Sequence, residues 1–241
     1  MAIVSGLDTP GLESVTMYPL SDTPAMSETR YGEQLFYDAS TCFLNWHSCA
    51  SCHQDGRSDP LSWDLLNDGR GNPKQIKSLL YSTRTPPVMS LGVRANARIA
   101  IEAGYIHDMF AVVPEEDLDA VHAYLDSLKA VRGPALVNGR LTPSATRGRN
   151  VFIGNCIECH SGPYFTDGKK HNLGTGTGQD AGKVFDTPTL VEIWRTAPYF
   201  HDGRYGSLEE AILAHPFATN LSAAEQSDLL EYLRSIDPEI N

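Results

Sequence analysis

Cys49-Ala-Ser-Cys52-His53 and Cys156-Ile-Glu-Cys159-His160 decide the fold, because each reads C-x-x-C-H, the attachment signature of c-type haem. Two thiols three positions apart can each form a thioether to one edge of a porphyrin, and the adjacent histidine then lies under the iron as its proximal ligand. The two copies use four of the five cysteines. We therefore predict two covalently attached haem c groups, with these residues as attachment sites and proximal ligands: Cys49, Cys52, His53, Cys156, Cys159 and His160.

Two other uses of paired cysteines fit less well. A four-cysteine zinc site also contains C-x-x-C pairs, but the histidine after each pair would then have no role. The gap between the two pairs is also far wider than the usual zinc spacing. A thioredoxin-like redox pair needs βαβ surroundings, which this sequence does not offer. Haem attachment is therefore favoured over both.

Length and charge narrow the function further. The chain has 241 residues, 41% of them hydrophobic, which suits one or two globular domains. Its formal net charge of -11 argues against nucleic-acid or anionic-membrane partners and favours basic ones. No apolar run approaches the length that spans a bilayer, and the first residues do not read as a signal peptide. Because haem attachment normally takes place outside the cytoplasm, we expect a periplasmic or extracellular protein whose leader has been removed, or a fragment of a longer exported protein.

The sequence pattern predicts an all-α fold with long loops. Segment 114–128 opens on a proline, continues with three acidic residues and repeats apolar residues at helical spacing. Segment 222–236 has the same design and opens on a capping box. Segments 54–76 and 161–186 are rich in glycine and turn-forming residues, which predicts loops wrapped around the haems.

The chain is expected to divide into two similar domains. A stretch rich in glycine and proline at residues 131–140 separates the two halves. We expect an N-terminal extension at 1–28, a first haem domain at 29–132 and a second haem domain at 133–241.

The two halves carry the same features in the same order, which indicates a duplication. Tyr124 and Tyr232 take the same place in the two predicted closing helices, and 232 − 124 gives an offset of 108 residues. The same offset places His107 on His215. The halves also share a Thr-Pro segment, at Thr85-Pro86-Pro87 and at Thr187-Pro188-Thr189.

A second histidine at a repeated position is what a distal iron ligand would look like. We therefore predict two bis-histidine sites, with His53 and His107 on the first iron and His160 and His215 on the second. Met89 is the main alternative to His107, because methionine is the distal ligand of high-potential cytochromes. The second half has no methionine at the corresponding place.

The remaining histidines and the fifth cysteine are predicted to have structural roles. His47 and His122 are expected at the surface, at a haem edge or in packing. His171 and His201 are expected to bond to haem propionates or to the backbone. Cys42 is expected to be a buried thiol.

Segments around both motifs have a recognisable family pattern. They are Tyr31-Gly-Glu-Gln-Leu-Phe36, Ser48-Cys-Ala-Ser-Cys-His-Gln54, Arg147-Gly-Arg-Asn-Val-Phe152, Gly162-Pro-Tyr-Phe-Thr-Asp-Gly168, Asp186-Thr-Pro-Thr-Leu190, Thr196-Ala-Pro-Tyr-Phe-His-Asp-Gly203 and Ser207-Leu-Glu-Glu-Ala211. Together they closely resemble bacterial di-haem cytochrome c peroxidases and the related MauG proteins, from about residue 30 onward. The resemblance implies two class I cytochrome c-like α domains facing each other, often with a calcium ion between them.

The chain departs from this family at positions that matter for function. In the peroxidases, the residue eight places after the serine of the Ser207 segment is a methionine that ligates the C-terminal haem, and MauG has a tyrosine ligand instead; here that residue is His215. The resemblance therefore supports His215 as a ligand independently of the duplication. The first half has no clear equivalent of the peroxidase Phe-Trp-Asp-Gly-Arg segment, and Glu102 is the candidate for the catalytic glutamate.

These observations predict a di-haem c-type cytochrome that transfers single electrons through two low-potential bis-histidine haems. It would act as a shuttle, as part of a surface electron conduit or in a stack of its own copies, with redox proteins or other cytochromes as partners. The alternative is a di-haem peroxidase or MauG-like oxidase with an open or openable first haem, in which Met89 and Glu102 matter instead of His107. A third reading is an interaction module that keeps its haems as vestigial cores.

Overall fold

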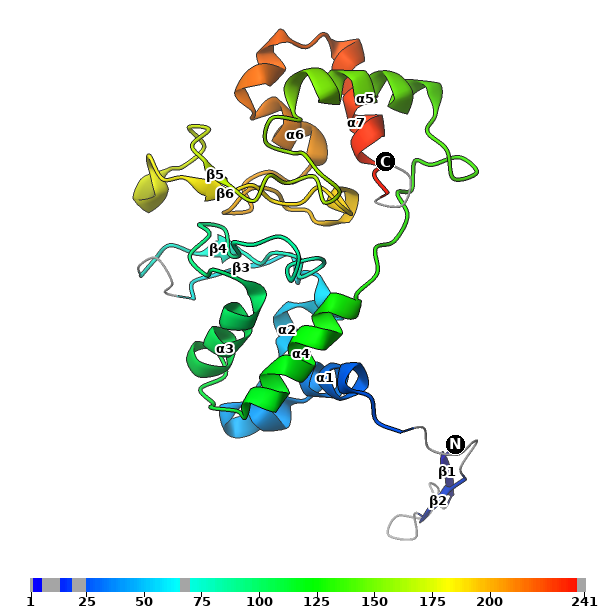
Figure 1. The fold of residues 1–241 in the computed structure, drawn as a ribbon, viewed down its shortest axis with the longest axis vertical. Helices are drawn as coiled ribbons and strands as arrows, with labels where there is room; N and C mark the ends of the chain where they lie inside the picture. Colours follow the sequence, from blue (N-terminus) through cyan, green and yellow to red (C-terminus); the bar gives the residue numbers. More distant parts are fainter. Residues whose placement is uncertain (1, 6–13, 19–24, 66–69, 238–241) are drawn as a thin grey trace.

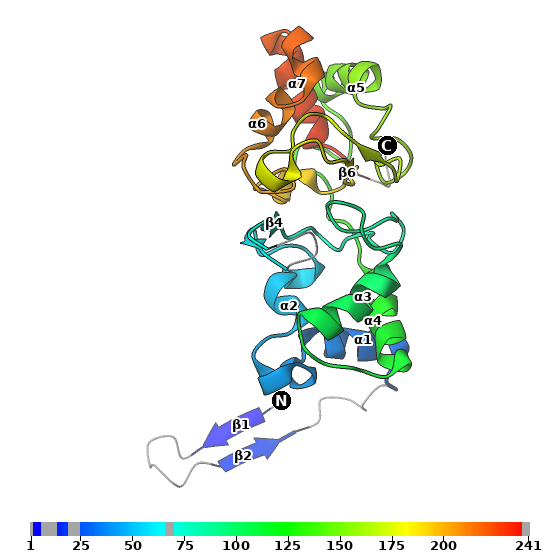
Figure 2. The same ribbon diagram turned by 90° about the vertical axis from the view of Figure 1, so that its left-hand side faces the viewer.

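The computed structural model of the chain describes residues 2–5, 14–18, 25–65 and 70–237. Most of its ordered elements are helices, gathered in two lobes that lie one above the other (Figure 1; Figure 2). The first lobe contains α1 (Glu28–Tyr37), α2 (Cys49–Cys52), α3 (Ala97–His107) and α4 (Glu115–Ser127), and the second contains α5 (Pro143–Asn155), α6 (Leu208–Leu213) and α7 (Ala223–Leu233). No helix in the described part of the chain is long and apolar enough to cross a membrane.

Both predicted closing helices are confirmed, with ends set by local chemistry. α4 follows Pro114 and carries three acidic residues in its first turn, where they favour the positive end of the helix dipole. α7 opens on the predicted capping box, in which Ser222 and Glu225 each accept a hydrogen bond from the other's backbone N–H. It ends at Leu233, three residues earlier than predicted, although Ile236 is still fully buried.

Glycines let the helices of each lobe cross closely. A Cβ atom on Gly32 of α1 would lie 1.8 Å from the carbonyl oxygen of Ala120 in α4. A Cβ atom on Gly148 of α5 would lie 1.9 Å from the carbonyl oxygen of Asp228 in α7. Because no other residue type lacks this atom, glycine is required at both crossings. The repeated crossing confirms that the two lobes share one design.

Each lobe has its own hydrophobic core. Phe36 packs on Tyr124 in the first core and Phe152 on Tyr232 in the second, with ring-centroid distances of 5.1 and 5.3 Å. Leu80 belongs to the second core although it precedes α3, so a loop of the first lobe inserts into the second. The domain boundaries at 28 and 132 stay a prediction, and residues 238–241 lie outside the described part.

The segments predicted to be long loops lie between the lobes. Each is largely irregular and contains one antiparallel ribbon of two-residue strands, β3 (Ser62–Trp63) with β4 (Lys74–Gln75) and β5 (Lys170–His171) with β6 (Phe185–Asp186). The two ribbons face each other across the junction (Figure 1). Residues 66–69 of the first loop lie outside the described part.

The N-terminal extension contains a hairpin that the sequence did not predict. β1 (Ala2–Ser5) pairs antiparallel with β2 (Ser14–Met17), with Val4 opposite Val15. The hairpin lies beyond the first lobe, away from the haem motifs (Figure 2). The other residues of the predicted 1–28 extension that fall at 1, 6–13 and 19–24 lie outside the described part.

Candidate haem sites and an open distal pocket

The first C-x-x-C-H motif forms the short helix α2 and the residue that follows it. Nδ1 of His53 lies 3.1 Å from the carbonyl oxygen of Arg57. Since the carbonyl can only accept, Nδ1 carries the proton and Nε2 keeps the lone pair that can bind a metal. Burial lowers the pKa of His53, which favours the neutral, ligating form of the ring.

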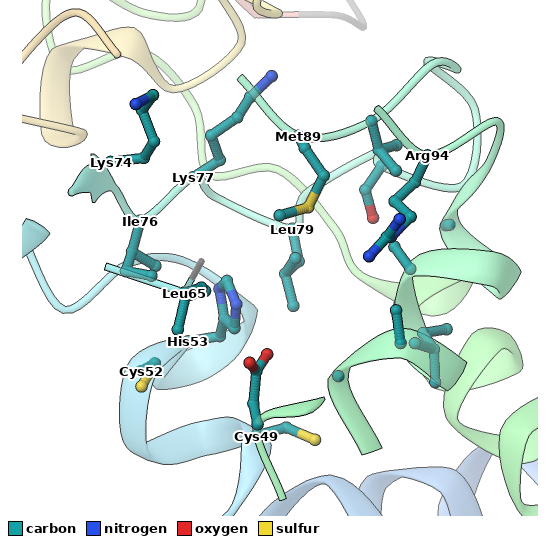
Figure 3. A pocket seen from close by; sticks show the side chains of 18 of the residues that line it. Cys49, Cys52, His53, Leu65, Lys74, Ile76, Lys77, Leu79, Met89 and Arg94 are labelled. Atoms are coloured by element: carbon teal, nitrogen blue, oxygen red, sulfur yellow. The ribbon is translucent and has the colours of Figure 1, made fainter. Parts of the chain in front are cut away.

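A cavity of about 710 Å³ opens on this motif, within the range of roughly 300–1,000 Å³ that is usual for ligand and cofactor sites. Figure 3 shows His53 pointing into it from the loop after α2, with Cys49 and Cys52 at its base and Met89 reaching in from the facing loop. Its walls are mostly apolar, and burial raises the pKa of the Cys49 thiol to about 12. Two thiols, one available imidazole nitrogen and apolar walls fit a covalently bound haem c.

In the second lobe, His160 of the motif and His215 lie close enough to interact electrostatically. Nδ1 of His160 lies 3.0 Å from the carbonyl oxygen of Phe165, and Nδ1 of His215 lies 2.8 Å from that of Ala211. Both rings therefore keep Nε2 free for a metal. Burial, with a smaller contribution from the neighbouring His215, lowers the pKa of His160 to about 4. The two imidazoles thus fit the proximal and distal positions of one haem.

Aromatic packing fixes the ring of His215. Phe200 and Phe217 lie against it, with ring centroids 5.5 and 5.6 Å away. Tyr205 in turn packs edge-on against Phe200 at 4.9 Å. Carbonyl and aromatic contacts therefore both orient the ring of His215.

The structural repeat around α3 and α6 follows an offset different from that of the closing helices. A β-bridge joins Val88 to Arg94 in the first half and Tyr199 to Tyr205 in the second, and 199 − 88 gives 111. The same offset relates the N-cap of α3, Asn96, to the N-cap of α6, Ser207. It also relates two pairs of residues with left-handed backbone, Tyr81 with Glu192 and Met89 with Phe200.

This offset changes the residue that corresponds to His215. Counted from the shared N-caps, the same place along the chain in the first lobe is Gly104, since 215 − 111 gives 104, whereas the offset of the closing helices gives His107. The two counts differ because α3 has eleven residues where α6 has six, so Gly104 lies inside α3 and His215 lies beyond the end of α6. The pairing of His107 with His215 therefore stays a prediction. The offset of 111 pairs Thr85 with Thr196, so the predicted match of Thr85-Pro86-Pro87 with Thr187-Pro188-Thr189 is wrong.

The wall at Gly104 is open and faces an acid. A Cβ atom on Gly104 would lie 3.9 Å from Oδ2 of Asp108, and no other atom of the described residues outside the local helix backbone would lie within 4 Å of it. Asp108 lines the cavity, and its pKa is raised by burial against the opposing effects of His107 and Arg94. His107 ends α3, is exposed and also lines the cavity, so its role as iron ligand stays a prediction.

The carboxylate at the cavity wall is not the one that the sequence offered as a candidate. Glu102 is exposed on α3 and does not line the cavity, whereas Asp108 does. The available signal was spacing, because residues four apart share a face of a helix and Asp108 lies four after Gly104.

The other predicted residues take mixed roles. Cys42 is a buried thiol as predicted, with Sγ 3.3 Å from Nδ1 of His47, which lies at the cavity wall. His171 and His201 contact carboxylates rather than the backbone, those of Asp167 at 2.8 Å and Asp180 at 3.3 Å. His122 is half-buried on α4. Calcium between the lobes stays a prediction.

No family model matches the chain. The gamma subunit of hydrazine synthase from Kuenenia stuttgartiensis is 28% identical over 285 aligned residues, covering 91% of this chain and 80% of the relative. A solved structure of hydrazine synthase from the same organism matches 89% of both chains at a TM-score of 0.79 and 26% identity. MauG from Methylorubrum extorquens is 26% identical, covering 92% of this chain and 81% of the relative.

The fold also matches a di-haem peroxidase from Burkholderia thailandensis, with a TM-score of 0.69 over 88% of this chain and 86% of the other at 16% identity. Each of these similarities covers at least 88% of the chain and so reaches into both lobes. Over most of its length the chain is therefore similar to the superfamily of MauG and the di-haem cytochrome c peroxidases.

Proposed function

We propose that this chain is a di-haem redox enzyme of the peroxidase type, which reduces hydrogen peroxide at its first site with electrons supplied through its second. One observation carries the proposal. The second site has an oriented histidine, His215, close to His160, whereas the first has Gly104 at the same number of residues from its helix N-cap, with a cavity beside it. With an open position on one iron and a filled position on the other, the first site would bind peroxide and the second would supply electrons.

The haem at each motif would supply one-electron redox chemistry and, at an open position, a place for a small ligand to bind. The chain contributes the surroundings. His53 would hold the first iron from one side, and Gly104 leaves the other side open. Asp108 would accept a proton from one peroxide oxygen and return it to the other as the O–O bond breaks. Two electrons and two further protons then yield two molecules of water.

Asp108 is suited to that proton transfer. Burial raises its pKa, so the carboxyl group binds a proton at a higher pH than an exposed aspartate does. Arg94, which favours the charged form, keeps this rise in check. Met89 closes the cavity from the facing loop, where its thioether adds an apolar surface.

A second candidate function is electron transfer without chemistry at an open site. It rests on His107, which lines the same cavity three residues after Gly104. If His107 bound the first iron, both sites would be bis-histidine and both potentials low. Under either function we propose a periplasmic or extracellular location and basic redox proteins as partners, which the net charge of -11 favours.

Electron paramagnetic resonance of the ferric holoprotein tests the proposal. We expect one high-spin and one low-spin haem, since one sixth position is open and one is filled. His215→Ala should convert the low-spin haem to high-spin, and His107→Ala should leave the spectrum unchanged. Two low-spin haems, one of which becomes high-spin in His107→Ala, would favour electron transfer instead.

A further inference from the structure

Glu192 is a buried acid of the second lobe that the proposed chemistry does not use. Only 1% of its surface is exposed. Its two carboxylate oxygens accept hydrogen bonds from Nε and Nη2 of Arg57 at 3.0 and 2.9 Å, the bidentate geometry of the strongest charge-assisted pairs. The backbone N–H of Val131 donates to the same carboxylate at 2.5 Å. Three hydrogen bonds therefore hold the carboxylate in place.

Arg57 belongs to the first lobe and is equally constrained. Its Nη1 donates to the carbonyl oxygen of Asp55 at 2.9 Å, and Nη2, which also binds Glu192, donates to the carbonyl oxygen of Lys129 at 2.8 Å. The main-chain carbonyl of the same residue accepts the Nδ1 proton of His53 at 3.1 Å. One residue thus binds the acid of the second lobe through its side chain and the proximal histidine of the first site through its backbone.

The second site has no such link in the residues that the structure describes. The carbonyl that orients His160 belongs to Phe165, whose side chain lies in the core of its own lobe. In the structural repeat, the counterpart of Glu192 is Tyr81, which packs on Tyr164 at a ring-centroid distance of 4.8 Å and carries no charge there. The arrangement at Glu192 is therefore specific to the first site.

We propose that Glu192 is a positioning residue for the first haem site. By fixing Arg57, it sets the length and angle of the hydrogen bond from His53 to the carbonyl. That bond controls how strongly the imidazole donates electrons to the iron, and with it the reduction potential. The second lobe thereby tunes the first site across the interface. The inference rests on the proposed function only in that a haem is bound to His53.

Loss of the link should raise the first-site potential, because a weaker bond from Nδ1 makes the imidazole a poorer donor to ferric iron. For Glu192→Gln we expect the ratio of reduced to oxidised first haem at fixed potential to increase about tenfold, or about 59 mV for a one-electron couple. Arg57→Lys keeps the net charge and removes the bidentate fork, so it should shift the same potential in the same direction by less. The second-site potential should not change.

Asp180→Asn is the matched control for charge. Asp180 is also a buried acid at the interface, 3.0 Å from Lys74 of the first lobe, but its hydrogen bonds and ion pairs do not involve Arg57. Spectroelectrochemical titration of the holoprotein measures both potentials in each variant. A first-site shift in Asp180→Asn equal to that in Glu192→Gln, or an unshifted Arg57→Lys, would overturn the positioning role.

Resonance Raman spectroscopy of the reduced holoprotein adds a measurement of the iron–histidine bond, which loss of a distant charge alone does not change. The iron–histidine stretching band of a five-coordinate first site should fall in frequency in Glu192→Gln and in Arg57→Lys. The same band at an unchanged frequency in both variants would refute the inference. Absence of the band from the wild-type protein would instead contradict the open first site, and the potentials would still decide the role of Glu192.

Discussion

At the scale of single residues, the proposed peroxide reduction depends on Asp108 as the proton acceptor. Its pKa is raised from the ordinary value of 3.8, mainly by burial. As the proton acceptor it must be ionised, so kcat/KM for peroxide should fall as the pH drops through this raised pKa. Asp108→Asn removes the acceptor while keeping the shape, and kcat/KM should fall by about 10²–10⁴-fold, the usual contribution of general acid–base catalysis.

Steady-state peroxide assays from pH 4 to 8 check this prediction, with roughly that interval chosen to cover the acidic limb expected of a carboxyl group. Glu102→Gln is the control, because that acid is exposed on the same helix and lies off the cavity. It should retain wild-type rates and the wild-type pH profile. Equal losses in the two variants would exclude Asp108 as the proton acceptor.

The sequence predicts the proximal residues from local spacing alone, whereas its prediction of the distal ones depends on an offset between distant segments. C-x-x-C-H fixes thiols and imidazole within five positions, so local spacing is enough to find His53 and His160. The distal position depends on how far a helix extends after its N-cap. Because α3 has five more residues than α6, the first-lobe residue that corresponds to His215 cannot be fixed from the offset of the closing helices alone.

At the scale of elements, the two glycine crossings hold each lobe together. A Cβ at Gly148 would lie 1.9 Å from the carbonyl oxygen of Asp228, far below any contact distance, and the carbonyl belongs to rigid helix backbone. Gly148→Ala should therefore lower the free energy of unfolding by about 3 kcal/mol or more, at the upper end for overpacking. Urea denaturation of the holoprotein measures the change.

The same helix supplies the control for that prediction. Gly154 of α5 has no atom within 4 Å of the place its Cβ would take. Gly154→Ala should stabilise the protein by up to about 1 kcal/mol through helix propensity. Destabilisation of both variants to the same degree would show that α5 is sensitive to any substitution rather than to the crossing.

Element types were predictable where pattern and caps agree, as in α4 and α7. The short ribbons β3–β4 and β5–β6 were not predicted, because two-residue strands give no alternation to read. The hairpin β1–β2 was missed although Ile3, Val4 and Val15 suit a strand. Its residues are largely exposed, and nothing in their spacing distinguishes a ribbon from an extended tail.

At the scale of the whole molecule, Asp180 links the lobes by charge. It belongs to the second lobe and contacts two residues of the first. It accepts a hydrogen bond from Asn72 at 2.9 Å and forms an ion pair with Lys74 at 3.0 Å. These contacts, with Lys183, lower its pKa to about 2 from 3.8 despite burial. Because the folded pKa is depressed, the contribution to stability is complete above about pH 4 and is lost as the pH falls toward 2.

The size of this contribution follows from the shift in pKa. A decrease of nearly two units corresponds to about 2 kcal/mol at neutral pH, since one unit is worth about 1.4 kcal/mol. Urea denaturation of wild-type and Asp180→Asn holoprotein at pH 7 and pH 2.5 measures it, and comparing the two proteins at each pH cancels the titration of the histidines. The wild type should be more stable at pH 7, and the difference should shrink by more than half at about pH 2.5. A difference independent of pH would mean that Asp180 stabilises the junction by packing and not by charge.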